Sequence, residues 1–136
     1  MPGPAFGIQM VQVANLVYSA SSGGSTTGID ISPSIGDIFM IISDRSGGTA
    51  AATITIEHSA ALSSGYTTVP ASAIFTVPDG VATAFGALST AAFTQVRGIN
   101  RQQLQQYLRV TIAGTTITHN IAIVVAYSVE NTGEIV

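Results

Sequence analysis

The stretch ATITIEHS, residues 52–59, decides the fold class, because its apolar and polar residues alternate. Successive side chains of a β-strand point to opposite faces of the sheet. Ala52, Ile54, Ile56 and His58 therefore share one face, while the other face carries only hydroxyl and carboxyl groups. The pattern predicts a half-buried strand whose apolar face lies on a core.

The same alternation recurs toward the C-terminus. In YLRVTIA, residues 107–113, Leu108, Val110 and Ile112 share one face and the residues between them share the other. The second half of the run 116–129 is apolar on both faces. Such a strand is either central in its sheet or has an outer face that meets another subunit.

Short β-branched segments separated by Gly, Ser, Pro and Asp recur along the whole chain, and helical periodicity is nearly absent. We predict an all-β, single-domain β-sandwich, jelly-roll-like or immunoglobulin-like, of about seven or eight strands. The polar segment before residue 107 is expected to be a loop or one short helix. The strands are expected at 8–18, 37–43, 51–58, 73–77, 91–97, 107–113 and 116–129.

The N-terminal segment 1–7 is expected to be an extended arm, so that the sandwich domain spans 8–136. Pro2 and Pro4 have no backbone N–H to donate to a sheet. Arms of this kind lie across a neighbouring subunit or fray.

Charge is scarce in this chain. Only 8% of the residues are charged and 46% are hydrophobic, the mean hydropathy is +0.48, and the formal net charge is −3. A free monomer is kept soluble by a mixed charged surface. The composition therefore predicts an assembly subunit whose exterior is covered by partners.

Several function classes are disfavoured by the same composition. The longest apolar runs, 38–42 and 121–127, are far shorter than the roughly 18 residues of a membrane-spanning helix. Four arginines and no lysine give no basic stripe for direct nucleic-acid binding. No signal peptide is expected from the N-terminal residues. The absence of cysteine excludes disulfides and fits synthesis in a reducing cytoplasm.

The adjacent residues Glu57, His58 and Ser59 offer the groups of a catalytic relay. In a strand they project alternately, so Glu57 and Ser59 face away from His58 and form no relay with it. A relay built from other strands, with Asp44, Ser63 or His119, stays open, although the sequence does not select one. We interpret His58 and His119 as structural and predict no catalytic residue.

Metal and cofactor sites are also not predicted. Asp30, Asp37 and Asp44 lie in the loop-rich first third but lack the spacing of a calcium loop, so turn formation is the favoured interpretation. No histidine pair has ligand spacing for zinc. We therefore predict no metal and no cofactor.

A resemblance to a known class of proteins rests on residues 51–129. ITIEHSAALSSGYTTVPAS, followed by QYLRVTIAGTTI and the apolar strand NIAIVVAYSV, resembles the small β-sandwich head proteins of tailed bacteriophages. The matching framework positions are His58, Ser59, Gly65, Tyr66, Val69, Tyr107, Leu108, Arg109 and Val110. The polar insert NRQQLQQ departs from the compact glycine-containing turn of those proteins.

The resemblance implies a capsid cement or decoration protein. Such a protein is not an enzyme; it sits on the exterior of the virion and clamps neighbouring major capsid subunits, commonly as a homotrimer. The expected partners are the major capsid protein and further copies of this chain, without nucleic acid or membrane. We predict interface residues in the arm and on the polar face of one strand, namely Pro2, Pro4, Phe6, Tyr107 and Arg109.

Three alternatives stay open. Another phage structural β-sandwich, from the tail or the head closure, would assemble into a ring or tube. A carbohydrate-binding or adhesion module would need a row of exposed aromatic side chains. A hydrolase using His58 or His119 is the least favoured of the three.

Overall fold

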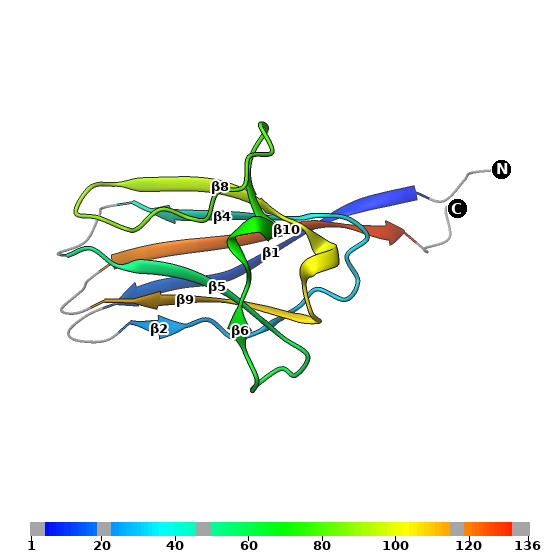
Figure 1. Ribbon diagram of the computed structural model, residues 1–136, viewed down its shortest axis with the longest axis horizontal. Coiled ribbons are helices and arrows are strands. Elements are labelled where there is room, and N and C mark those ends of the chain that lie inside the picture. The colour runs from blue at the N-terminus through cyan, green and yellow to red at the C-terminus, as the bar shows by residue number, and fades with distance from the viewer. Residues whose placement is uncertain (1–4, 19–22, 46–49, 115–118, 132–136) are drawn as a thin grey trace.

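The computed structural model describes the backbone of residues 5–18, 23–45, 50–114 and 119–131, and the side chains of 23–45, 50–114 and 119–129. Its strands form two layers that lie against each other (Figure 1). The strands are β1 (Ala5–Tyr18), β2 (Gly24–Ser25), β3 (Ile29–Asp30), β4 (Ile38–Asp44), β5 (Thr53–Ser59), β6 (Thr67–Thr68), β7 (Ile74–Thr76), β8 (Phe93–Ile99), β9 (Tyr107–Ala113) and β10 (His119–Asn131). The described residues also contain two single-turn 3₁₀ helices, η1 (Ala71–Ala73) and η2 (Arg101–Gln103).

Both sheets are antiparallel throughout. The first sheet has the order β1-β10-β4-β8-β7, and the second has the order β2-β9-β5-β6, with β3 also pairing with β9. Two packed antiparallel sheets with almost no helix confirm the predicted all-β, single-domain sandwich. None of the helices in the described part of the chain has the length and hydropathy needed to cross a bilayer.

A strand is present at each of the seven predicted places, and the range 107–113 is reproduced without change in β9. Residues 116–118 of the last predicted strand lie outside the described residues. The short helix allowed before residue 107 is η2, in which the Asn100 side chain accepts a hydrogen bond from the Gln102 N–H at 3.0 Å. Gly80, after β7, has a φ of 72°, a value that glycine adopts without a steric penalty.

The first strand begins earlier than expected. Ala5, Phe6 and Gly7, which we placed in an arm, pair with Asn131, Glu130 and Val129 of β10. Their backbone therefore belongs to the first sheet. Pro2 and Pro4 lie outside the described residues, so the arm stays a prediction for residues 1–4.

The core lies between the two sheets and is made almost entirely of aliphatic side chains. The predicted inward faces of β5 and β9 are confirmed, because Ile54, Ile56, Leu108, Val110 and Ile112 are all buried. The fully buried set with the largest side chains is Ile31, Ile38, Met40, Ile42, Leu88, Ile99, Leu108, Ile112, Ile121, Ile123 and His119. The strand β10 is central, between β1 and β4, as its apolar pattern suggested.

Candidate interaction surface

The two sheets differ in what their outer faces present. In the first sheet, Ile38, Met40 and Ile42 of β4 point into the core and are completely buried. The intervening residues Phe39 and Ile41 must therefore point outward, and Phe39 is 41% exposed. Apolar residues thus occupy both sides of β4.

The register of the strands gathers these outward residues into rows. Phe39 lies opposite Ala126 of β10 and Gly98 of β8, and Gly98 lies opposite Phe75 of β7. The next row joins Val124, Ile41 and Val96, of which Val96 is 37% exposed. We call these six side chains the outer apolar face: Phe39, Ile41, Phe75, Val96, Val124 and Ala126.

Glycine at position 98 allows the outer apolar face to be flat. A Cβ added there would lie 2.1 Å from Cε2 and 2.2 Å from Cζ of Phe75. The phenyl ring therefore lies directly against the backbone of β8. A ring over a strand glycine fills the space that the missing side chain leaves and extends the apolar surface.

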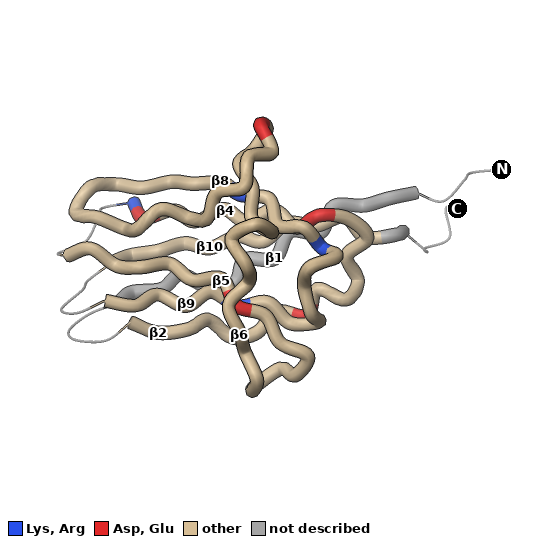
Figure 2. Tube along the Cα trace, in the orientation of Figure 1, with Lys and Arg blue, Asp and Glu red and all other residues tan. Residues whose placement is uncertain are grey.

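No charged residue occurs in these rows, which lie wholly within the residues whose side chains the structure describes. The third row, Ala122, Ser43 and Thr94, is uncharged too, and its two hydroxyl oxygens lie 3.0 Å apart. Charged positions are sparse along β4, β8 and β10 (Figure 2). Arg97 of β8 lies opposite the inward-facing Met40, and its guanidinium bonds the carbonyls of Thr83 and Ala84.

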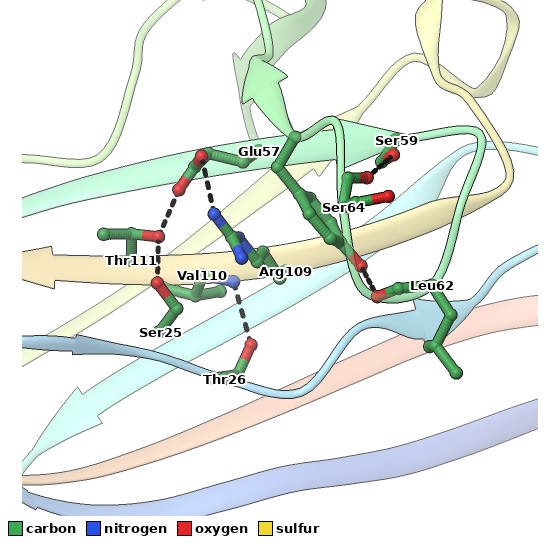
Figure 3. A network of polar contacts seen from close by, with 10 residues as sticks. Ser25, Thr26, Glu57, Ser59, Leu62, Ser64, Arg109, Val110 and Thr111 are labelled. Atoms are coloured by element: carbon green, nitrogen blue, oxygen red, sulfur yellow. Dashed lines mark hydrogen bonds and ion pairs between the residues drawn. The ribbon is translucent and has the colours of Figure 1, made fainter.

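The outer face of the second sheet is polar and bonds to itself (Figure 3). Glu57 of β5 accepts hydrogen bonds from the Thr111 hydroxyl and from Arg109 Nη2, the latter at 3.2 Å. Ser25 and Thr111 share a hydrogen bond of 2.8 Å. The Arg109 guanidinium also lies 3.9 Å from the centroid of the Tyr66 ring. This network leaves the face charged but internally neutralised.

Arg109 and Tyr107, two of the predicted interface residues, lie on that polar face. The charge of Arg109 is already paired with Glu57 and stacked on Tyr66, and 28% of its side chain is exposed. Tyr107 is half-buried, and its hydroxyl accepts a hydrogen bond from Gln106. Phe6 is at a register position opposite Glu130, and its side chain lies outside the described residues.

The Glu57, His58 and Ser59 groups are separated, as the strand geometry predicts. His58 Nδ1 accepts the Gln105 N–H at 3.2 Å, and burial lowers the pKa of its imidazole. The Ser59 hydroxyl donates to the Ser64 carbonyl and accepts the Ala61 N–H. Each group is thus engaged in a different structural bond.

His119 is joined to Asp44 instead of to a nucleophile. Its Nδ1 bonds Asp44 Oδ2, and its Nε2 bonds the Ala50 carbonyl at 2.8 Å. Both side chains are completely buried. Both ring nitrogens are therefore engaged within the chain. Sequence reasoning named both residues but did not predict that they meet.

The other two candidate aspartates, Asp30 and Asp37, accept hydrogen bonds from the backbone. Asp30 accepts a hydrogen bond from the Ser32 N–H at 2.9 Å. Hydrogen bonds from the side chain and the backbone of Ser32 lower the pKa of the Asp30 carboxyl. Asp37 accepts the Arg101 N–H at 3.3 Å. Within the described residues, no three His, Asp or Glu side chains come together as metal ligands.

An open hollow of about 360 Å³ lies beside η2, lined by Ser34, Asp37, Asn100, Arg101 and their neighbours. Its hydroxyl is not activated, because Ser34 Oγ donates to the Ile31 carbonyl and accepts from Arg101 Nε at 2.7 Å. A nucleophilic serine needs a neighbouring base to accept its proton. Ser34 therefore lacks the geometry of a serine nucleophile.

The Glu57 network makes a testable contribution to stability at neutral pH. Burial acts to raise the pKa of Glu57, but the hydrogen bonds from Thr111 and Arg109 outweigh it and hold the pKa below its ordinary value of 4.5. A carboxyl group with a lowered folded-state pKa stabilises the fold above the unfolded-state value, and this contribution is lost as the pH falls through the folded-state value.

We expect Glu57→Gln to lower the free energy of unfolding at pH 7 by about 1–2 kcal/mol. The difference from the wild type should shrink as the pH falls from 5 to 3, because the wild-type carboxyl then takes up a proton. Urea denaturation of both proteins at each pH measures this difference. The contributions of titratable groups that both proteins share cancel in it. A difference that is the same at pH 3 and pH 7 would contradict the role of the charge.

No known protein-family model matches the sequence, and no curated protein is significantly similar to it. The outer apolar face is a feature that the sequence analysis missed in part. Its signal was the run 38–42, which is apolar at consecutive positions and so leaves apolar residues on both sides of β4.

Proposed function

We propose that this chain is a non-enzymatic structural protein that binds the outer surface of a phage capsid and cements neighbouring major capsid subunits. The observation that carries the proposal is the contrast between the two sheets. The outer face of the second sheet bonds to itself through Glu57, Arg109 and Thr111. The outer apolar face offers exposed Phe39 and Val96 to a partner instead.

Apolar surface that is exposed to water favours association with a partner. A contiguous apolar patch on a soluble domain marks an interaction site, and the centre of a protein interface is depleted in charge. Burying apolar surface contributes roughly 25 cal/mol per Å². Copies that contact both the shell and one another bind with avidity, so a moderate affinity for each capsid site suffices.

The carbohydrate-binding alternative is less well supported. Of the aromatic side chains that the structure describes, only Phe39 is exposed, and the others are buried or half-buried. Tyr66 lies on the polar face, and Cζ of Arg109 lies 3.9 Å from the centroid of its ring. A single exposed ring does not make the row on which sugars stack.

The test is co-sedimentation with purified capsids of the virus that encodes the chain. We expect saturable binding by the wild type and at least tenfold weaker binding by Val96→Lys, because an unpaired ammonium would be buried at the interface. Thr55→Lys, on the polar outer face of β5, is the matched control and should bind within about twofold of the wild type.

Two results would count against the proposal. Absence of wild-type binding would remove the capsid as the partner. A loss of binding in Thr55→Lys with none in Val96→Lys would move the interface to the polar face of the second sheet. Circular dichroism of both variants checks that each retains the wild-type fold.

A further inference from the structure

The strand β1 forms one edge of the first sheet. It pairs with β10 along its whole length, from Ala5 opposite Asn131 to Tyr18 opposite His119. Within the described residues it has no second partner strand. One side of its backbone therefore presents N–H and C=O groups that a further strand can bond.

This edge lacks most of the features that keep edges from pairing. Protected edges are short, or carry lysine, proline or inward-pointing charges. β1 has 14 residues, and its sequence AFGIQMVQVANLVY contains no charged residue and no proline. Its one irregularity is a register shift between Gln12 and Ala14, which divides the strand and leaves 5–12 as the longer regular half.

The other sheet edges do not match it in length. β7 has three residues, and its far side is bridged by Ala82 opposite Phe75, with the Thr83 N–H bonded to the Ile74 carbonyl. The edge strands of the second sheet, β2, β3 and β6, have two residues each. Among the described strands, only another β1 offers a regular edge of comparable length.

We propose that two copies of this chain associate about a two-fold axis by antiparallel pairing of residues 5–12 of β1. Such an interface is isologous, so the same residues serve on both sides. The paired segments would be about 27 Å long. No like charges meet across the axis, because the segment has none. The two first sheets then form one continuous sheet.

This pairing is independent of capsid binding, and it differs from the trimer that the phage resemblance implies. A ring of three copies joined by strand pairing needs two different edges that match each other, and the described strands offer only one long edge. The outer apolar face is not consumed by the pairing. It continues across the junction, because the strands of both copies belong to the same sheet.

Sedimentation equilibrium of the full chain tests the proposal. We expect a mass of twice the 13.9 kDa of the single chain. Gln12→Lys should weaken the association at least tenfold, because it places a charge on the pairing edge. Thr68→Lys is the matched control, on the exposed short edge strand β6, and should leave the mass unchanged.

Hydrogen exchange of the wild type gives a second measurement that needs no variant. At an open antiparallel edge, alternate amides point away from the sheet and exchange rapidly. In the proposed pair, all amides of residues 6–12 should exchange slowly. Alternating fast and slow amides in this segment would overturn the proposal, as would a monomeric or trimeric mass.

A variant on the outer apolar face distinguishes edge pairing from packing of the two copies face to face. If Val96→Lys dissociates the dimer while Gln12→Lys does not, the copies pack face to face and the edge pairing is wrong. A protein that dimerises through β1 without binding capsids would retain this inference and lose the proposed function. The two failures are therefore distinguishable.

Discussion

Replacing Asp44 with alanine is expected to lower the free energy of unfolding by about 3–5 kcal/mol, because it breaks a fully buried pair from one side. Asp44 and His119 are both completely buried, with Nδ1 of the ring bonded to Oδ2 of the carboxyl. The Ala50 carbonyl can only accept, so Nε2 must donate to it. Without the carboxyl, Nδ1 remains buried with no partner.

The control is Asp44→Asn. Its amide can donate to Nδ1 of His119 while Nε2 still donates to the Ala50 carbonyl, so the loss is expected to be about 1 kcal/mol. Urea denaturation at pH 7 measures both variants. If alanine and asparagine cost the same, the hydrogen bond contributes little and the burial of the pair has to be explained by another contact.

A double-mutant cycle with His119→Ala sharpens the result. The two residues lie on adjacent strands, since Asp44 is opposite Ile121 in the register of β4 and β10. We expect the double variant to be less destabilised than the sum of the single variants, because each single variant leaves an unpaired polar group. Additive losses would contradict direct coupling. The pair would also fix the strand register, because a slip of one residue would turn Asp44 outward.

The strands were predictable because local pattern determines them. The alternation in residues 52–59 gave the inward face of β5 correctly, and the polar segment before residue 107 ended where β9 begins. The two-residue strands β2, β3 and β6 were missed. Each of these strands is defined only by its pairing with another strand of the second sheet, and two residues are too few to show a periodicity in the sequence.

The candidate surface was only partly predictable for the same reason. The apolar character of both faces of β10 indicated either a central strand or a covered one, and β10 is central. Whether its outer residues join a wider apolar surface depends on the register that sets Val124 beside Ile41 and Val96. Register between distant strands is a tertiary property. The contact between Asp44 and His119 could not be predicted either, because it also depends on the register of two strands far apart in the sequence.

The charge of Arg109 illustrates a different limit. An outward arginine on a half-buried strand is free to contact a partner as far as its direction goes. We predicted Arg109 as an interface residue, and this stays a prediction. The cross-strand position of Glu57 and the ring of Tyr66 engage it within the same chain. Sequence alternation gives the direction of a side chain but not its neighbours.

Ile123→Ala is the second variant with a large expected effect, a loss of about 2–5 kcal/mol in the free energy of unfolding. Ile123 is completely buried in β10, and strands on both sides hold that strand in place. The surrounding core therefore relaxes little into the space that the side chain leaves, and the lost contacts add to the lost burial. Urea denaturation of the full chain measures the difference.

The neighbouring residue provides the matched control, because Val124 lies on the opposite face of the same strand, beside Ile41. Val124→Ala is expected to cost less than about 1 kcal/mol in unfolding, since its side chain is only half-buried in the free chain. It should weaken binding to capsids several-fold, whereas Ile123→Ala, if folded at the assay temperature, should bind like the wild type. Equal losses of stability in the two variants would mean that both faces of β10 are buried within the chain. The outer apolar face would then not be evidence for a binding partner. Separation of the two effects would instead assign stability to one face of the strand and assembly to the other.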